Sequence, residues 1–190
     1  MKKDLGVIAG VFPMPVLIVA AYDEDGKANA MNVAWGQICD MDKIILFLDE
    51  DHKTTKNILI SKAFTVALAD EKNMVMADYV GIVSGNDVGD KFESTGYHAE
   101  KSSRVNAPII TEYPVTLECE LLEKVNTEYV NGIVGKIVNV IADEEVLTDK
   151  NKVDVKKLNA IMFDQFQAGY YSVGEKVGQA WVEGKEMMKK

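Results

Sequence analysis

Short apolar runs separated by polar turns predict a chain built mainly from β-strands. Three of the runs are rich in branched aliphatic residues and too short for most helices: residues 15–22, 43–48 and 63–69. Residues 113–123 alternate apolar and polar positions, which is typical of an antiparallel strand with one solvent-facing side. The polar turn over residues 23–27 predicts a hairpin that leads into one extended run over residues 28–38, with Gly36 as a bulge.

Between these strands, three segments predict short helices. Residues 51–61 begin with capping residues, and residues 73–83 carry apolar side chains near helical spacing before Gly85. Residues 153–162 form the third segment, and the chain beyond them is predicted as loop with a final segment around Ala180 and Trp181. Residues 84–106 show no clear period, which predicts one long ordered loop of the kind that is usually functional.

Residues 128–142 fit either a helix or a strand. Val134, Val138 and Ile141 make a helical stripe, but the many β-branched residues and two glycines favour a twisted strand. With this strand the fold class is mainly β, a partly open antiparallel barrel with a few short helices. The 190 residues are near the usual size of one domain, so we expect a single domain over residues 1–190.

The composition narrows the possible ligands. Lys plus Arg number 21 and Asp plus Glu 30, so the formal net charge is −9. Such a surface repels nucleic acid and anionic membranes, and a phosphate-bearing ligand needs a local positive site. The histidines and cysteines show no zinc-like spacing, so we expect no metal: His52, His98, Cys39 and Cys119.

The N-terminus has some features of a signal peptide. Two lysines precede an apolar stretch over residues 5–22, and residues 19–21 resemble a cleavage site. Asp4 lies in the basic region, and Pro13 and Pro15 interrupt the apolar one, which argues against both a signal peptide and a membrane span. We therefore expect a cytoplasmic protein.

Three polar segments stand out as candidate sites. Residues 29–35 form a strand with small polar residues, residues 52–57 gather donors at a helix start, and residues 89–93 lie in the long loop. Each also has an ordinary explanation, as an edge strand, a helix cap or a solvated loop. The chain has no dinucleotide fingerprint, phosphate-binding lysine loop or nucleophile elbow.

These segments, together with others in the same order, resemble the flavin reductase-like family, whose domain is an FMN-binding split barrel. The resemblance covers nearly the whole chain and is greatest to the flavoredoxin-like branch. It is carried by residues 13–22, 25–36, 52–58, 77–85, 90–93, 107–110 and 117–119, and by Tyr170-Tyr171 with Gly174. The implied fold is an antiparallel Greek-key split β-barrel.

The resemblance also implies a cofactor site. The strand over residues 31–35 would lie along the isoalloxazine ring of FMN, the helix start would hold the phosphate and ribityl chain, and Phe92 would help to close the pocket. The implied cofactor-binding residues are Asn29, Met31, Asn32, Val33, Ala34, Trp35, His52, Thr54, Thr55, Asn57, Lys91 and Phe92. Two features depart from the family pattern: Asn32 stands where many relatives have Ser or Thr, and residues 49–51 are acidic.

The function implied is that of an oxidoreductase with noncovalent FMN, in a homodimer whose interface borders the flavin. Hydride or electron transfer would pass through flavin N5, so no catalytic side chain is required. The donor would be NAD(P)H or a reduced protein, and the acceptor free flavin, a disulfide or another molecule.

Two alternatives to this function remain open. One is a carrier protein that stores FMN or shuttles electrons without turnover. The other is reduction of disulfides with Cys39 near the ring. The sequence also supports a homodimer independently of the resemblance. Met31, Trp35 and Trp181 have large side chains of the kind that is common in protein interfaces.

Overall fold

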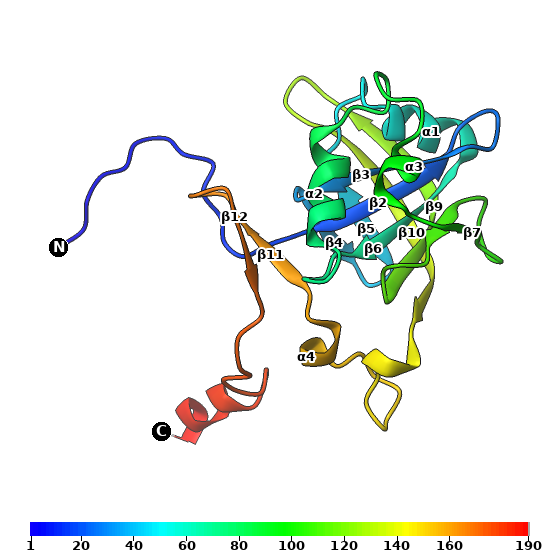
Figure 1. The fold of residues 1–190 in the computed structure, drawn as a ribbon. Coiled ribbons are helices and arrows are strands. Elements are labelled where there is room, and N and C mark those ends of the chain that lie inside the picture. Colours follow the sequence, from blue (N-terminus) through cyan, green and yellow to red (C-terminus); the bar gives the residue numbers. More distant parts are fainter. Residues whose placement is uncertain (190) are drawn as a thin grey trace.

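The computed structural model describes residues 1–189, which are arranged around a seven-stranded antiparallel sheet (Figure 1). Its strand order is β3-β2-β6-β9-β10-β5-β4. The strands are β2 (Leu17–Tyr22), β3 (Ala28–Val33), β4 (Gly36–Asp40), β5 (Lys43–Leu46), β6 (Ala63–Leu68), β9 (Val115–Asn126) and β10 (Asn131–Ala142). The strand preferred for residues 128–142 is therefore confirmed.

The two edge strands of this sheet, β3 and β4, are consecutive in the chain and are joined only by Ala34 and Trp35. The sheet curls into a barrel that stays open between these edges, so the predicted mainly β split barrel is confirmed. The single extended run over residues 28–38 is wrong, because the chain turns at residues 34–35. Trp35 is held there by its carbonyl oxygen, which accepts a hydrogen bond of 2.8 Å from the Phe47 amide.

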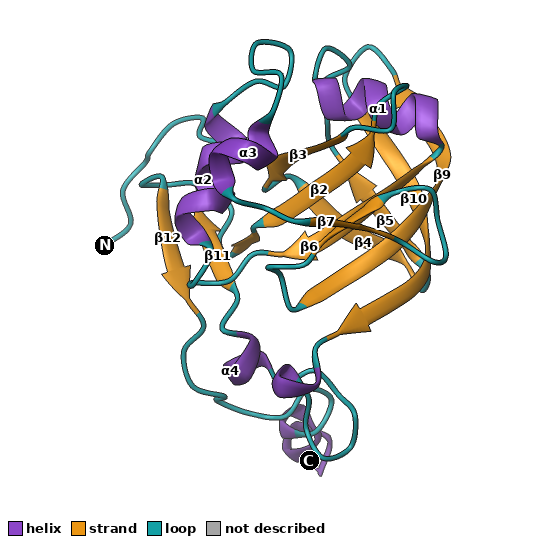
Figure 2. Cartoon of the chain, turned by 45° about the vertical axis from the view of Figure 1, so that its right-hand side comes forward, coloured by secondary structure: helices purple, strands orange, loops and turns teal. Residues whose placement is uncertain are grey.

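Smaller elements surround the barrel. The strands β1 (Met14–Pro15), β11 (Ile161–Asp164) and β12 (Gly169–Ser172) form a second sheet, and β7 (Ala99–Lys101) pairs with β8 (Pro108–Ile110). The α-helices are α1 (Lys53–Ser61), α2 (Met74–Ile82), α3 (Lys91–Thr95) and α4 (Val155–Leu158), and 3-10 turns cover Glu144–Val146 and Glu183–Lys189. Helices α2 and α3 pack beside β3 (Figure 2), while the N-terminal and C-terminal segments extend away from the barrel.

Two other predictions need correction. The loop expected over residues 84–106 contains α3 and β7. Helix α3 forms because Asp90 caps it, accepting a hydrogen bond from the Glu93 amide at 3.1 Å, and it ends at Gly96 with φ +71°. The helix expected over residues 153–162 ends at Asn159 in the left-handed conformation, and the chain continues into β11 and β12 where loop was expected.

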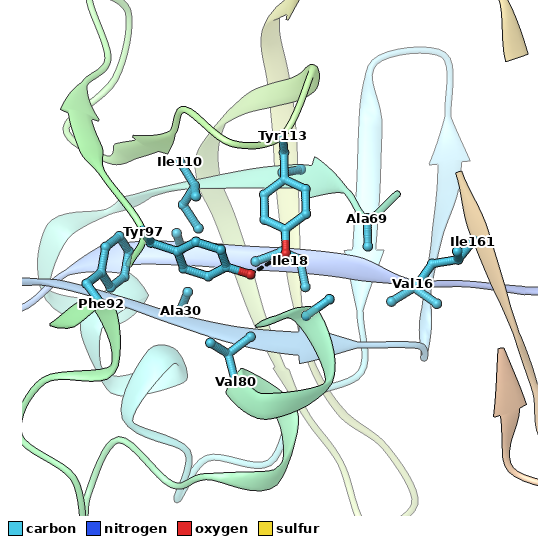
Figure 3. Packing of buried hydrophobic residues seen from close by; sticks show 13 residues of the cluster. Val16, Ile18, Ala30, Ala69, Val80, Phe92, Tyr97, Ile110, Tyr113 and Ile161 are labelled. Atoms are coloured by element: carbon cyan, nitrogen blue, oxygen red, sulfur yellow. Dashed lines mark hydrogen bonds between the residues drawn. The ribbon is translucent and has the colours of Figure 1, made fainter. Parts of the chain in front are cut away.

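Strand β2 separates two apolar cores. Leu17, Val19 and Ala21 point into the barrel, where they pack in a cluster with Phe64. The alternate residues of β2 point to the other side, toward α2 and α3; Figure 3 shows Ile18 there among aromatic side chains. Because both faces are buried, β2 reads as a continuous apolar run. Within residues 1–189, no helix combines the length and the apolar character needed to cross a membrane.

Candidate functional site

A cavity of about 230 Å³ lies where the open edge of β3 meets the start of α1 and the end of α2. We call it the polar cavity. Its lining residues come from four segments that are distant in sequence: Asn29, Met31, His52, Lys53, Thr54, Val80, Gly81, Ile82, Val83, Ser84, Gly85 and Lys91. It thus brings together five of the residues expected to bind the cofactor, namely Asn29, Met31, His52, Thr54 and Lys91.

The start of α1 offers free backbone donors to this cavity. His52 is the N-cap residue in an extended conformation, but its side chain does not cap the helix, and the first turn contains no acidic residue. Among residues 1–189, no group accepts a hydrogen bond from the amides of Lys53, Thr54 and Thr55. An uncapped helix start of this kind favours an anion through its amides and the helix dipole.

A buried hydrogen bond fixes the next part of the wall. The Asn29 side chain donates from Nδ2 to Thr54 Oγ1 at 2.6 Å, so the Thr54 hydroxyl keeps its own proton for another acceptor. Gly85 lies directly against this pair, since a Cβ there would come within 2.5 Å of Asn29 Oδ1. Any side chain larger than that of glycine at position 85 would therefore collide with Asn29.

Lys91 is the most unusual side chain of the cavity because it is charged and only 4% exposed. Its Nζ donates to the carbonyl oxygens of Val80 at 2.9 Å and Ala30 at 3.1 Å, which ties α2 to β3. Burial lowers the pKa of Lys91 to about 8. An ammonium has three donors, so one N–H remains for a ligand in the cavity that Lys91 lines.

Beyond His52 the site continues into more apolar space. A second cavity of about 490 Å³, the aromatic cavity, is lined by Trp35, Phe47, Leu48, Asp49, His52, Tyr129, Val130 and Asn131. Trp35 and Phe47 also border a groove of about 540 Å³ beneath the N-terminal segment. Polar donors at one end and exposed aromatic rings at the other suit a ligand with an anionic tail and a flat ring system.

Several of the expected site residues lie elsewhere. Val33 faces the barrel core, and Phe92 is buried beside Tyr97, as Figure 3 shows, with ring centroids 5.7 Å apart. Thr55 donates from Oγ1 to the Asp49 carbonyl at 2.8 Å, and the Asn57 side chain is fully buried with no hydrogen-bond partner among the described residues. These four residues line none of the cavities described above.

The other expected residues lie around the turn that closes β3. Ala34 and Trp35 border the groove beneath the N-terminal segment, and Asn32 lies on the face of β3 that meets α2, where its Nδ2 donates to the Ala77 carbonyl at 3.0 Å. Cys39 is exposed on β4 and lines none of the three cavities. Cys119 is buried in the barrel, and burial raises the pKa of its thiol to about 12.

The sequence of the chain matches a known family. A family model described as the flavin reductase-like domain matches residues 9–158 of the chain. The chain belongs to the flavin reductase-like family.

Solved structures of the family are similar over almost the whole chain. Flavoredoxin of Desulfovibrio vulgaris (Miyazaki F) is 32% identical, covering 97% of this chain and 100% of its own, with a TM-score of 0.92. Flavoredoxin from Methanosarcina acetivorans is 26% identical, covering 98% and 100%, with a TM-score of 0.88. An FMN-binding domain of a flavin reductase-like enzyme from Shewanella baltica OS155 shares the fold at 20% identity, covering 87% and 88%, with a TM-score of 0.78.

The polar cavity of this flavin reductase-like chain also contains residues that were not among the expected cofactor-binding residues. Lys53 lines the polar cavity and forms an ion pair with Asp23 at 3.6 Å, and Ser84 and Gly85 close the cavity from the end of α2. Two signals pointed to them: the lysine beside His52, and a Ser-Gly pair after a predicted helix. Neither signal indicates which side chains meet across the barrel edge.

Proposed function

We propose that the chain is an oxidoreductase that binds one FMN noncovalently, with the phosphate in the polar cavity and the ring toward Trp35. The observation that carries this proposal is Lys91, a buried ammonium beside an uncapped helix start in a protein of net charge −9. We further propose that residues 1–190 act as one cytoplasmic domain.

The residues around the site fit FMN. A phosphate dianion is stabilised by charge-assisted donors, which Lys91, the Thr54 hydroxyl and the first amides of α1 supply. Strand β3 is an edge strand, so its free backbone groups can bond the polar edge of a ring laid against Met31 and Trp35. Bound FMN would supply hydride or electron transfer, and the protein would supply binding, orientation and electrostatics.

The simplest test is the visible absorption spectrum of the purified protein, before and after addition of FMN. We expect a flavin spectrum or saturable binding of added FMN. A colourless protein that also fails to bind added FMN would overturn the proposed function.

Gly85→Ala is expected to weaken FMN binding about 10-fold, since one displaced hydrogen-bonding group in a charged site costs roughly 1.4 kcal/mol. The new methyl would meet Asn29 Oδ1 at 2.5 Å and push it away from Thr54. Gly89→Ala is the matched control, because a Cβ at Gly89 has nothing within 4 Å. Fluorescence titration measures the FMN affinity of both variants. Equal affinities would contradict the proposal that the FMN phosphate lies in the polar cavity.

The oxidoreductase can be separated from its alternative, a non-catalytic carrier, by turnover. We propose NAD(P)H or a reduced protein as the donor and free flavin or another acceptor as the oxidant. Steady-state oxidation of NADH and NADPH with added flavin would support a reductase. Stoichiometric reduction without turnover would favour the carrier. Disulfide reduction through Cys39 has less support, because Cys39 lines none of the three cavities.

We also propose a homodimer whose interface borders the flavin. Trp35 is 53% exposed and Trp181 is 91% exposed, and both terminal segments extend away from the barrel (Figure 1). Exposed aromatic side chains of this size favour an interface. Light scattering is expected to give twice the 21.0 kDa chain mass. A monomer that binds FMN tightly would show that one chain completes the pocket.

A further inference from the structure

A smaller cavity of about 210 Å³ lies on the other face of β3, between α2 and the β11–β12 hairpin. We call it the hairpin cavity. Its walls include Asn32 from β3, Ala34 from the turn after β3, Asp78 and Gly81 from α2, and Phe163 and Tyr170 from the hairpin. Gly81 permits the close approach of α2 to β3, because a Cβ there would meet Asn32 Cβ at 3.0 Å.

Two polar side chains of this cavity are hydrogen-bonded to each other. The Tyr170 hydroxyl donates to Asp78 Oδ1 at 2.8 Å, and the Asn32 side chain lines the same cavity. Burial and the bond to Asp78 raise the pKa of Tyr170 to about 12, so its phenol keeps its proton at neutral pH. Tyr170 therefore holds the Asp78 carboxylate in place as a neutral donor.

The carboxylate of Asp78 can accept more hydrogen bonds than these contacts supply. It is partly buried, and among residues 1–189 no Lys, Arg or His forms an ion pair with it and no group donates to its Oδ2. Asn32 uses its Nδ2 on the Ala77 carbonyl, which leaves its Oδ1 as an acceptor. One N–H of Asn32 is also unused, but the two free acceptors, Asn32 Oδ1 and Asp78 Oδ2, stand beside a negative charge. The cavity therefore favours donors and disfavours anions.

The size and position of the cavity limit the ligand further. Its volume equals that of roughly seven waters, which is room for one ring with a short substituent. Phe163 supplies an aromatic wall, and its ring lies 5.9 Å from that of Tyr170. The hairpin cavity shares Gly81 with the polar cavity, and Ala34 with the groove beneath the N-terminal segment. A molecule bound there would lie beside the strand to which we assign the flavin ring.

We propose that the hairpin cavity binds a small single-ring molecule that carries a cationic or neutral N–H or O–H donor, with Asp78 as the group that selects it and Tyr170 as the positioning residue. The place of this molecule next to the cofactor rests on the proposed function. The binding itself does not, because every residue of the cavity belongs to the barrel, α2 or the hairpin.

The experiment uses benzamidine as the probe and benzoate as its anionic counterpart, titrated into the flavin-free full-length protein and followed by ligand-detected NMR. We expect benzamidine to bind the wild type and benzoate not to bind. Asp78→Asn should weaken benzamidine at least 10-fold, as expected for loss of a charged hydrogen bond. Tyr170→Phe should weaken it less, because Asp78 remains. Asp149→Asn, an equal charge change at an exposed position outside the cavity, should have no effect.

The same variants separate this proposal from the proposed function. Benzamidine binding of equal strength in the wild type and Asp78→Asn, or no binding by a folded wild type, would overturn the hairpin site. If FMN fails to bind but benzamidine binding depends on Asp78, the cavity proposal stands while the flavin proposal falls. With FMN bound, benzamidine should shift the flavin absorption band in the wild type and not in Asp78→Asn. Thermal melting of each variant identifies any loss of fold.

Discussion

Lys91→Met is expected to weaken FMN binding roughly 10- to 100-fold while changing riboflavin affinity little. A hydrogen bond to a charged group contributes about 1.5–3 kcal/mol, and about 1.4 kcal/mol corresponds to one decade of affinity. Methionine keeps most of the length of the buried side chain and removes only the ammonium. Riboflavin lacks the phosphate. Its affinity therefore shows how the substitution affects the rest of the binding site, apart from the contact with the phosphate.

The comparison of two flavins is needed because Lys91 also has a structural role. Its Nζ joins the carbonyl oxygens of Ala30 and Val80, and Lys91→Met leaves both without this donor. We therefore expect the melting temperature to fall as well. Titration of both flavins by calorimetry gives the ratio of their affinities. If Lys91→Met weakens the binding of FMN and of riboflavin equally, Lys91 does not bind the phosphate.

The pKa of Lys91 adds a pH dependence to the same prediction. Because that pKa is lowered to about 8, the ammonium is lost as the pH rises through this value, and FMN affinity of the wild type should fall there. A bound phosphate raises the pKa of Lys91, so the decline in the complex begins at higher pH. Lys91→Met should lack this decline in titrations on both sides of pH 8.

Without ligand, the same pKa affects stability in the opposite direction. Between about 8 and 10.5 the unfolded chain holds a proton on this lysine that the folded protein has released. The contribution of Lys91 to the free energy of unfolding therefore increases with pH across that range.

Strands were predictable from the sequence wherever a strand is buried on both faces or alternates cleanly. Residues 17–22 could be recognised as a strand because all their side chains are apolar or aromatic, but nothing in that run shows that it separates two cores. The turn at Ala34 and Trp35 escaped prediction, since it depends on Phe47, which follows β5, the second strand after the turn. Contacts between segments that are distant in sequence therefore decide where an extended run ends in a turn.

The candidate site was predictable as a set of segments but not as a set of side chains. Thr54, Thr55 and Asn57 lie in one donor-rich segment, yet a helix turns about 100° per residue and distributes them over its surface. Thr54 reaches the polar cavity, Thr55 turns to Asp49, and Asn57 points into the interior. The role of Gly85 depends on a strand residue 56 positions earlier, Asn29, which no local pattern reveals.

Gly135→Ala is expected to destabilise the protein by about 1–3 kcal/mol, the usual cost of inserting a methyl group into a packed core. Gly135 lies in β10 over the fully buried ring of Phe64, and a Cβ there would overlap Phe64 Cζ and come within 2.8 Å of Cε1. At roughly 2–4 °C per kcal/mol, thermal unfolding should begin several degrees lower. Denaturant titration measures the free energy of unfolding directly.

Phe64→Leu should relieve this clash, because leucine lacks the two ring atoms that the new methyl would meet. Alone, Phe64→Leu leaves a cavity and destabilises the barrel. Combined with Gly135→Ala, it should cost at least about 1 kcal/mol less than the sum of the two single changes. Gly132→Ala is the control, because its Cβ would meet the backbone oxygen of Leu46 at 2.7 Å, which no change at Phe64 removes. Additive free energies for both pairs would show that the ring does not impose the glycine at position 135.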